Sequence, residues 1–228
     1  MTEIVQASGI RRVYGQGHSA RTALDRVHLS VEKGEFLTVF GPSGSGKSTL
    51  LSIIGTLDRD FEGTLSLFGH DVTKLHDSDL SRLRSKHVGF VFQGFNLLDH
   101  LSVLENVTVP FLFAQNAPTR TASKQIAIRA LERVGLADRA NDRTGELSGG
   151  QRQRVAIARS VVMKPNLLLC DEPTGNLDSE TAEQIIGLFR SLHNDGGVTL
   201  VCATHDTRIA KAATRNITLR AGQLDENT

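Results

Sequence analysis

The first third of the chain alternates apolar and polar residues in short runs, which is the pattern of half-buried β-strands. These runs read ASGIRRVY, ALDRVHLSV and FLTVF, and turn sequences such as EKGE and FEG separate them. TLSLFG and VGFVFQ continue the pattern. FLTVF leads directly into a glycine-rich loop, after which KSTLLSIIGTL predicts a helix.

Between about residues 97 and 147 the spacing of the apolar residues changes. LENVTVPFLFA and ASKQIAIRALERVGL place apolar side chains three and four residues apart, and Gly135 is a suitable helix stop. This spacing predicts a helical insert in a chain that otherwise alternates strands and helices.

The remainder of the chain returns to that alternation. GGQRQRVAIARSVV predicts a helix and NLLLCDE a buried strand; a helix over 179–193, the strand VTLVCAT, a short helix and the strand NITLRAG follow. The order favours an α/β fold with one mainly parallel sheet and helices on both faces. We expect one domain over residues 1–228, with the tail DENT frayed.

Composition narrows the class of partner. The 26 Lys and Arg residues balance the 25 Asp and Glu residues and alternate with them, so the sequence makes no electrostatic case for nucleic acid. The N-terminus lacks a signal-peptide pattern, and no window approaches the roughly 18 apolar residues of a membrane span. We expect a cytosolic protein, which leaves a membrane partner open. We interpret Cys170 and Cys202, both in apolar runs, as reduced core residues.

The glycine-rich loop has the residues of a phosphate-binding loop. Gly41 to Ser48 match G-x-x-x-x-G-K-[ST] between a strand and a helix. Glycines let backbone N–H groups converge on anionic oxygens, and the helix start adds about half a positive charge. Lys47 would reach the β- and γ-phosphates, and the Ser48 hydroxyl is available to Mg²⁺. The alternative is a glycine-rich turn with an exposed lysine. A dinucleotide fingerprint fails because Thr49 stands where a third glycine is needed.

An acidic pair ends the apolar run NLLLC. Asp171 and Glu172 are adjacent, and successive strand residues point to opposite faces, so the two carboxylates need not share one task. Beside a phosphate loop, Asp171 can hold Mg²⁺ through water while Glu172 polarises the attacking water. Adjacent acids are commonly just solvated, but a pair that ends so apolar a run favours a functional role.

Three further residues are ambiguous by themselves. His205 and Gln93 each follow a predicted strand, where such residues are commonly structural. Next to a γ-phosphate, His205 could contact the phosphate or the attacking water, and Gln93 could reach Mg²⁺ or that water. Tyr14, the single tyrosine, could stack on adenine, although a core or surface tyrosine is nearly as consistent with the sequence.

A second glycine run, LSGGQ at 147–151, has no role in an ordinary nucleotide-binding domain. Ser148 offers a hydroxyl, and Gly149 and Gly150 expose backbone N–H groups at the start of a helix, which is an anion-binding arrangement. Within one chain no phosphate is left for it. A glycine N-cap on an amphipathic helix is the alternative explanation.

With Lys47, Gln93, LSGGQ, DEP and His205 in this order, the chain resembles the ATP-binding cassette (ABC) family of ATPases over essentially its whole length. The resemblance implies a P-loop NTPase core with a mainly parallel sheet, N-terminal antiparallel strands and a helical subdomain over roughly residues 95–162. It implies ATP and Mg²⁺ as ligands. It also implies a head-to-tail homodimer in the ATP-bound state, in which LSGGQ closes over the ATP that the partner holds.

The resemblance also assigns roles to individual residues. It makes Glu172, His205 and Gln93 catalytic, and it places Mg²⁺ with Ser48, Gln93 and Asp171. The residues that match the family's nucleotide contacts are Tyr14, Gly41, Ser43, Gly44, Ser45, Gly46, Lys47, Ser48, Thr49, Ser148, Gly149, Gly150, Gln151 and Asp178.

A narrower likeness suggests what the ATPase drives. GFVFQGFNLL, ENVTVPF and DEPTGNLDS are similar to the ATPases of the lipoprotein-release, macrolide-export and antimicrobial-peptide-export group. This implies a separate integral membrane permease, attachment at the cytoplasmic face of the membrane, and export or extraction by mechanotransmission. The permease would dock around Gly94 to Leu104, in the exposed-looking apolar run GFNLLDHLSVL.

Two other functions use the same motifs. A regulatory ATPase that controls a cell-wall hydrolase in cell division stays open, because its ATP-hydrolysing residues would be identical. A soluble cassette of DNA repair or translation is disfavoured, because the sequence has neither a coiled-coil insert nor a second cassette.

Overall fold

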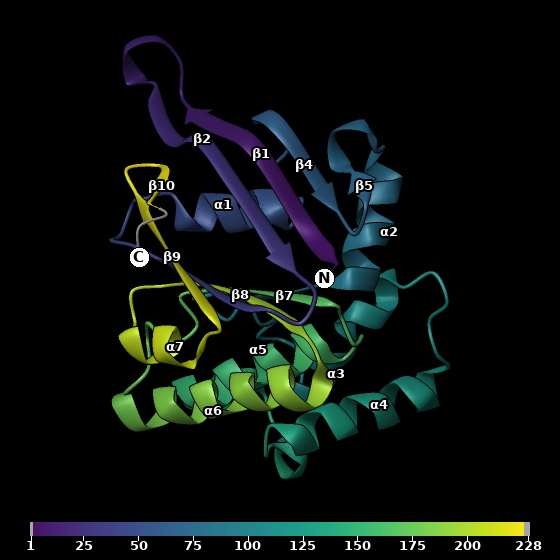
Figure 1. Cartoon of the computed structure of the whole chain (residues 1–228). Helices are drawn as coiled ribbons and strands as arrows, with labels where there is room; N and C mark the ends of the chain where they lie inside the picture. Colours follow the sequence, from purple (N-terminus) through teal and green to yellow (C-terminus); the bar gives the residue numbers. More distant parts are fainter. Residues whose placement is uncertain (1, 226–228) are drawn as a thin grey trace.

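Helix α1 (Lys47–Ile54) lies between two β-sheets in the computed structural model, which describes residues 2–225 (Figure 1). The first sheet is antiparallel and has the order β2-β1-β4-β5; the second has the order β10-β9-β3-β8-β7-β6. The first sheet contains β1 (Glu3–Tyr14), β2 (Arg21–Glu32), β4 (Glu62–Leu67) and β5 (His70–Asp71). The second contains β3 (Phe36–Phe40), β6 (Val88–Val91), β7 (Leu167–Asp171), β8 (Thr199–Thr204), β9 (Arg215–Arg220) and β10 (Gln223–Asp225).

The antiparallel sheet keeps the alternation seen in the sequence. In β1, Val5 is buried while its neighbour Gln6 is exposed. Gln6 pairs with Ser30 of β2 and Ser66 of β4, so the outward polar residues line up across the strands. One face of this sheet therefore packs toward α1 and the other faces solvent.

The second sheet brings three loops to one edge. β3, β7 and β8 are parallel neighbours and almost completely buried, as expected for strands covered on both faces. Phe40 at the end of β3 pairs with Thr204 of β8, and Asp171 at the end of β7 pairs with Ala203. The glycine-rich loop, the acidic pair and His205 therefore all follow the carboxyl ends of adjacent strands, where α/β proteins bind their ligands.

Helices cover the parallel sheet on both sides. Besides α1, the helices are α2 (Asp77–His87), α3 (Val103–Thr108), α4 (Arg120–Arg133), α5 (Gly149–Val161), α6 (Ser179–Gly196) and α7 (Thr207–Ala212). Figure 1 shows α5, α6 and α7 on the side of the parallel sheet away from α1.

The helices α3, α4 and α5 share a hydrophobic cluster of their own. Val107, Leu131 and Val155 are fully buried in it, and it is separate from the two clusters that pack on the sheets. These helices fall within residues 95–162, the segment for which the sequence predicts a helical subdomain. Gly135 follows α4 with a positive φ of 70°, which suits the residue beyond a helix end.

The structure adds two details about the helices. The sequence pattern does not predict α2, because only Leu80 and Leu83 of DSDLSRLRSKH are buried. LENVTVPFLFA is helical but not continuous: α3 ends at Thr108, and a 3-10 helix spans Val109–Phe113 with Pro110 near its start. Proline lacks the N–H that would continue the α-helical hydrogen bonds.

The chain end differs from its prediction as well. Asp225, expected to be frayed, pairs with Thr218 as the last residue of β10. The other three residues of the tail lie outside the described residues. The helix expected over 179–193 continues to Gly196 and stops at Gly197, whose φ is 60°.

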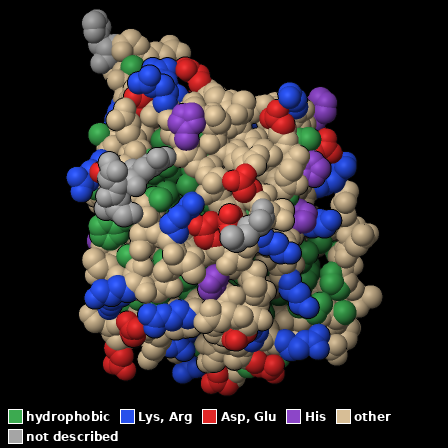
Figure 2. All heavy atoms as spheres, viewed as in Figure 1, with side chains coloured by type: hydrophobic (Ala, Val, Ile, Leu, Met, Phe, Trp, Pro, Cys, Tyr) green, Lys and Arg blue, Asp and Glu red, His purple; other side chains and the backbone are tan. Residues whose placement is uncertain are grey.

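No helix among residues 2–225 is both long and apolar enough to cross a membrane. On the face shown in Figure 2, Lys and Arg side chains are interspersed with Asp and Glu rather than gathered into a patch of one sign. Cys170 and Cys202 are buried free thiols, as predicted for core residues.

Candidate nucleotide-binding site

The glycine-rich loop wraps around a buried lysine. Lys47 begins α1 and is only 5% exposed, and its Nζ donates hydrogen bonds to the carbonyl oxygens of Gly41 (2.8 Å) and Pro42 (3.1 Å). The alternative of a glycine-rich turn with an exposed lysine is therefore wrong. The loop curls back over its own ammonium group, which places the positive charge at the start of the helix.

Two glycines of the loop stand where a side chain cannot fit. A Cβ on Gly41 would lie 2.3 Å from the carbonyl oxygen of Leu219, and one on Gly46 would lie 2.4 Å from that of Ala23. Gly46 also has a φ of 108°, which L-residues rarely adopt. The loop backbone therefore approaches Leu219 and Ala23 too closely for a side chain at either position.

The loop holds an unsatisfied polar atom that suits an anionic ligand. Ser45 is 4% exposed, and its buried Oγ has no hydrogen-bond partner among the described residues. An orphaned buried hydroxyl is costly unless something binds it. Together with Lys47 and the backbone N–H groups of the α1 N-terminus, it fits the oxygens of a triphosphate.

Asp171 faces the first turn of α1. The Ser48 hydroxyl donates to its Oδ1 over 3.0 Å. Burial and the neighbouring charge of Glu172 raise the pKa of Asp171, although the Ser48 hydrogen bond opposes the rise. A hydroxyl beside a half-buried carboxylate is an oxygen donor set that fits Mg²⁺.

Glu172 points to different partners from Asp171. Its Oε1 lies 3.2 Å from Lys47 Nζ and its Oε2 lies 2.9 Å from His205 Nδ1. Its side chain is 13% exposed, and its φ of 45° is unusual for a non-glycine residue. The backbone leaves the β conformation there, so this carboxylate turns toward the phosphate loop and His205.

Gln93 lies beside the turn that follows Glu172. The Asn176 side chain donates to the backbone oxygen of Gln93 over 3.2 Å, and a Cβ on Gly175 would lie 3.3 Å from Gln93 Nε2. The structure therefore brings together Lys47, Ser48, Gln93, the acidic pair and His205. Among residues 2–225 no cluster of three or more Asp, Glu, His or Cys side chains could hold a metal ion by itself. A metal at Asp171 would therefore need hydroxyl, amide or phosphate oxygens to complete its ligands.

Tyr14 lies next to the phosphate loop although it is far away in the sequence. It is 42% exposed and lines a hollow of about 210 Å³ together with Gly44, Lys47 and Thr49. Arg21 lines the same hollow and donates to the backbone oxygen of Gly44 over 3.2 Å. Sequence reasoning missed Arg21, because an isolated arginine in a strand carries no signal of its own.

The second glycine run caps α5. Ser148 is the N-cap: its Oγ accepts a hydrogen bond from the Gln151 N–H (3.3 Å), and the Gln151 side chain accepts one from the Ser148 N–H (2.9 Å). The alternative of a structural cap is thus partly right, with serine rather than glycine as the capping residue. Ser148 is nevertheless exposed, as a contact with another molecule requires.

This run packs on α6 rather than on the phosphate loop. A Cβ on Gly150 would lie 2.2 Å from Thr181 Cγ2, whereas one on Gly149 would find Leu177 at 3.8 Å. Asp178, also predicted as a site residue, is the N-cap of α6 and binds Thr181, whose hydrogen bonds lower its pKa. Among the described residues no hydrogen bond or ion pair joins 147–151 to the phosphate loop.

A buried glutamine of α5 contacts the loop that follows the acidic pair, and sequence reasoning did not single it out. Gln153 of α5 is 1% exposed and its Nε2 donates to the backbone oxygen of Pro173 over 2.7 Å, just after the acidic pair.

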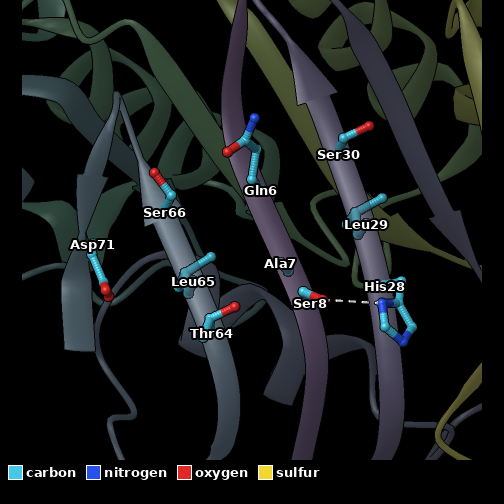
Figure 3. Close-up of a pocket in the computed structure, with 10 residues that line it drawn as sticks. All are labelled: Gln6, Ala7, Ser8, His28, Leu29, Ser30, Thr64, Leu65, Ser66 and Asp71. Carbon is cyan, nitrogen blue, oxygen red and sulfur yellow. Dashed lines mark hydrogen bonds between the residues drawn. The ribbon is translucent and has the colours of Figure 1, made fainter.

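Figure 3 shows a further hollow, of about 590 Å³, on the solvent face of the antiparallel sheet. Polar residues make up most of its lining, together with Ala7, Leu29 and Leu65, and none of the predicted site residues is among them. Ser8 Oγ and His28 Nδ1 lie 3.3 Å apart there. The hollow is the outward side of the strand alternation.

A strand–loop–helix phosphate cradle, with an acidic pair ending another parallel strand of the same sheet, defines a P-loop nucleoside triphosphatase. A profile described as "ABC transporter" matches residues 24–175. The chain therefore belongs to the ABC transporter family and is an ATP-binding cassette ATPase, which confirms the predicted fold class.

Named relatives support the same family. The chain is 46% identical over 217 residues to the ABC transporter ATP-binding protein YvrO of Bacillus subtilis, covering 95% of this chain and 93% of YvrO. It is 42% identical over 224 residues to the macrolide export ATP-binding/permease protein MacB of Rhodopirellula baltica. That match covers 98% of this chain but 33% of MacB, so the chain spans about a third of that relative.

Among solved structures, the fold is similar to that of the ATP-binding cassette MJ0796 of Methanocaldococcus jannaschii, described as a dimer in a post-hydrolysis state bound to ADP and Pi. The TM-score is 0.91 at 39% sequence identity, over 97% of each chain.

Proposed function

We propose that this chain hydrolyses ATP at two composite sites of a head-to-tail homodimer and thereby drives a separate membrane permease. The observation that carries the proposal is the contrast between its two glycine runs. The first lies among Lys47, Ser48 and the acidic pair, whereas the second presents an exposed helix start away from them. A second copy would bring a phosphate to that helix start, and MJ0796 is described as a dimer.

Within one site, each residue has a role that its position supports. Tyr14 stacks on the base, and the loop from Gly41 to Thr49 binds the phosphates. Ser48, Asp171 and Gln93 would hold Mg²⁺, which supplies charge neutralisation between the β- and γ-phosphates.

Glu172 accepts a proton from the attacking water, and His205 contacts the γ-phosphate. Ser148, Gly149, Gly150 and Gln151 come from the other copy, together with Asp178.

A mixing experiment tests the composite site. Lys47→Ala disables the phosphate loop, and Gly149→Asp places a carboxylate at the exposed helix start, where it repels phosphate. Both variants also carry Glu172→Gln to slow hydrolysis. A mixed dimer then contains one site with an intact loop and an intact LSGGQ. We expect about one trapped ATP per mixed dimer and none in either variant alone, measured after gel filtration of differently tagged chains. Mixed dimers without trapped nucleotide would sink the proposal.

The permease contact rests on a second set of residues. Val103, within the run expected to be exposed, is fully buried, so that part of the prediction is wrong. The most exposed large apolar residues are instead Leu112 (79%) and Phe113 (70%) of the 3-10 helix. Phe113 lines a groove of about 410 Å³ with Leu57, Phe90, Phe92, Val109 and Pro110. We place the docking of a cytoplasmic permease segment in this groove, next to the run 94–104.

The neighbouring leucine provides a matched control for that contact. Leu112 lines a different hollow, between the 3-10 helix and α4. Phe113→Glu should abolish co-purification with the permease and leave the ATPase activity of the isolated chain unchanged, whereas Leu112→Glu should have the smaller effect. Equal binding by wild type and Phe113→Glu would place the permease elsewhere.

The names of relatives bear on the cargo. MacB is named a macrolide export protein, so export of drugs, or release of peptides or lipoproteins, is the activity we propose for the complex. The chain would then lie at the cytoplasmic face of the membrane, held there by its permease. Residues 95–162 would move as a helical subdomain between the groove and the partner's ATP.

A further inference from the structure

A partly buried arginine lies behind the tyrosine that is proposed to stack on the base. The side chain of Arg12 is 12% exposed, and its Cζ lies 4.3 Å from the centre of the Tyr14 ring. One ring face is therefore already covered by a guanidinium group. The ring still lines the hollow beside the phosphate loop, so a nucleobase can stack only on its other side.

The same arginine is held by the carboxylate of Asp58, which lies in the loop just after α1. Arg12 Nε donates to Asp58 Oδ2 over 2.8 Å, and its guanidinium also bonds to Asp60. The Asp58 N–H donates to the backbone oxygen of Ser52 in α1 (3.2 Å). Asp58 is thus fixed to the helix that begins with Lys47, and Arg12 joins the strand of Tyr14 to that helix.

Tyr14 contacts the same carboxylate. Its hydroxyl donates to Asp58 Oδ2 over 3.1 Å, so the ring is held at its tip by Asp58 and on one face by Arg12. Burial acts to raise the pKa of Asp58, but hydrogen bonds from the Asp60 N–H, Arg12 and Tyr14 outweigh it and lower the pKa. The carboxylate is therefore ionised wherever the protein is folded near neutral pH.

We propose that Arg12 and Asp58 are positioning residues for nucleotide binding. They hold the Tyr14 ring at a set distance from the phosphate loop, so that base and triphosphate are bound together. This inference rests on the proposed role of Tyr14. It adds that base affinity depends on two residues that do not touch the nucleotide, because freezing the ring beforehand reduces the entropy lost on binding.

A neighbouring ion pair provides the matched control. Arg11 lies directly before Arg12 on the same strand and binds Glu62 over 2.7 Å. The side chains of Arg11 and Glu62 are more exposed than that of Arg12, at 39% and 71%. No ring contact to Arg11 occurs among the described residues. An effect that arises simply from loss of an ion pair near the hairpin should therefore appear equally in Arg11→Ala.

The test compares ATP with inorganic tripolyphosphate, which lacks the base. We expect Arg12→Ala and Asp58→Asn each to weaken ATP binding by about fivefold, the range expected for one aromatic or cation–π contact, and Arg11→Ala to change it by less than about twofold. Tripolyphosphate affinity should stay within about twofold of wild type in all three variants. Calorimetry with Mg²⁺ present measures both ligands.

The double variant completes the test. If Arg12 acts through Tyr14, then Arg12→Ala combined with Tyr14→Ala should bind ATP no more weakly than Tyr14→Ala alone. Equal losses for ATP and tripolyphosphate, or losses that multiply in the double variant, would overturn the positioning role. Should Tyr14→Ala by itself leave ATP affinity unchanged, the proposed base platform fails instead. A wild-type chain that binds neither ligand would refute the phosphate loop.

Discussion

The two glycine runs resemble each other in sequence but differ in what surrounds them. The phosphate loop closes on its own chain: Lys47 is buried, bonds two loop carbonyls and lies beside Glu172. The LSGGQ run is exposed at Ser148, and a Cβ added at Gly150 would meet the methyl group of Thr181 in α6. Both are helix starts that favour anions. A helix start by itself is therefore not a binding site; the charged side chains around it make it one.

The largest effect should come from the acid that touches both Lys47 and His205. Glu172→Gln keeps the shape of the side chain but removes the base, so turnover should fall by about 10²–10⁴-fold while ATP binding is retained. Steady-state phosphate release and equilibrium ATP binding measure the two effects. Near-normal turnover would show that another group accepts the proton and that Glu172 is not the general base.

The LSGGQ run can be disrupted by substitutions that leave the phosphate loop unchanged. Gly150→Ala forces a methyl group against Thr181 and should displace the start of α5, lowering turnover by about 10²-fold, the scale of a 1 Å misplacement. Gly149→Ala, whose Cβ meets only an ordinary contact at 3.8 Å, is the matched control. Monomer affinity for ATP should be unchanged in both.

A compensating substitution sharpens the same result. Thr181→Ser removes the clashing methyl group yet keeps the hydroxyl that bonds Asp178, so it should restore much of the turnover lost in Gly150→Ala. If Gly150→Ala and Gly149→Ala were equally active, the packing of LSGGQ on α6 would not matter for catalysis.

A substitution in the phosphate loop should change the affinity for ATP rather than the geometry of the dimer. Lys47→Ala removes a buried cation from the phosphate cradle and should weaken ATP binding by about 30-fold or more. Lys33→Ala, at an exposed lysine that precedes β3, should leave the affinity unchanged. Titration with a fluorescent ATP analogue measures both. Similar affinities for the two variants would contradict the assignment of the loop.

The smallest effect concerns stability. Because burial raises the pKa of Asp171, its ionised form costs the folded state free energy at neutral pH. Asp171→Asn should therefore stabilise the ligand-free protein by about 1 kcal/mol, or ~2–4 °C in Tm, while Mg²⁺-dependent hydrolysis is lost.

The sign of its pH dependence follows from linkage. A folded-state pKa above the unfolded value means that the wild type gains stability as pH falls through that raised pKa. The advantage of Asp171→Asn should thus be greatest at neutral pH and shrink on acidification. Thermal melts of both proteins at several pH values measure it. An advantage that grew as the pH fell would show that burial does not govern this carboxylate.

Individual elements show how far the sequence pattern reaches. β7 and α5 are recognisable because each has a continuous apolar run or a regular apolar spacing. α2 escapes because its helix is mostly polar and buries two leucines, and β10 escapes because three residues carry no period. The capping-box pattern could have predicted Ser148 as the N-cap with Gln151 as its partner. The hypothesis of a glycine N-cap assigned that position to the wrong residue type.

The local chemistry can be predicted from the amino-acid sequence: a phosphate loop after an apolar strand, two carboxylates ending another strand, and a second glycine run at a helix start. Those features depend on residues adjacent in the chain. Three other features come from packing: Arg12 contacts Asp58, Gly150 lies against Thr181, and Leu112 and Phe113 are exposed. Each of these depends on how separate elements pack, because side chains far apart in sequence meet only once register and helix position are set.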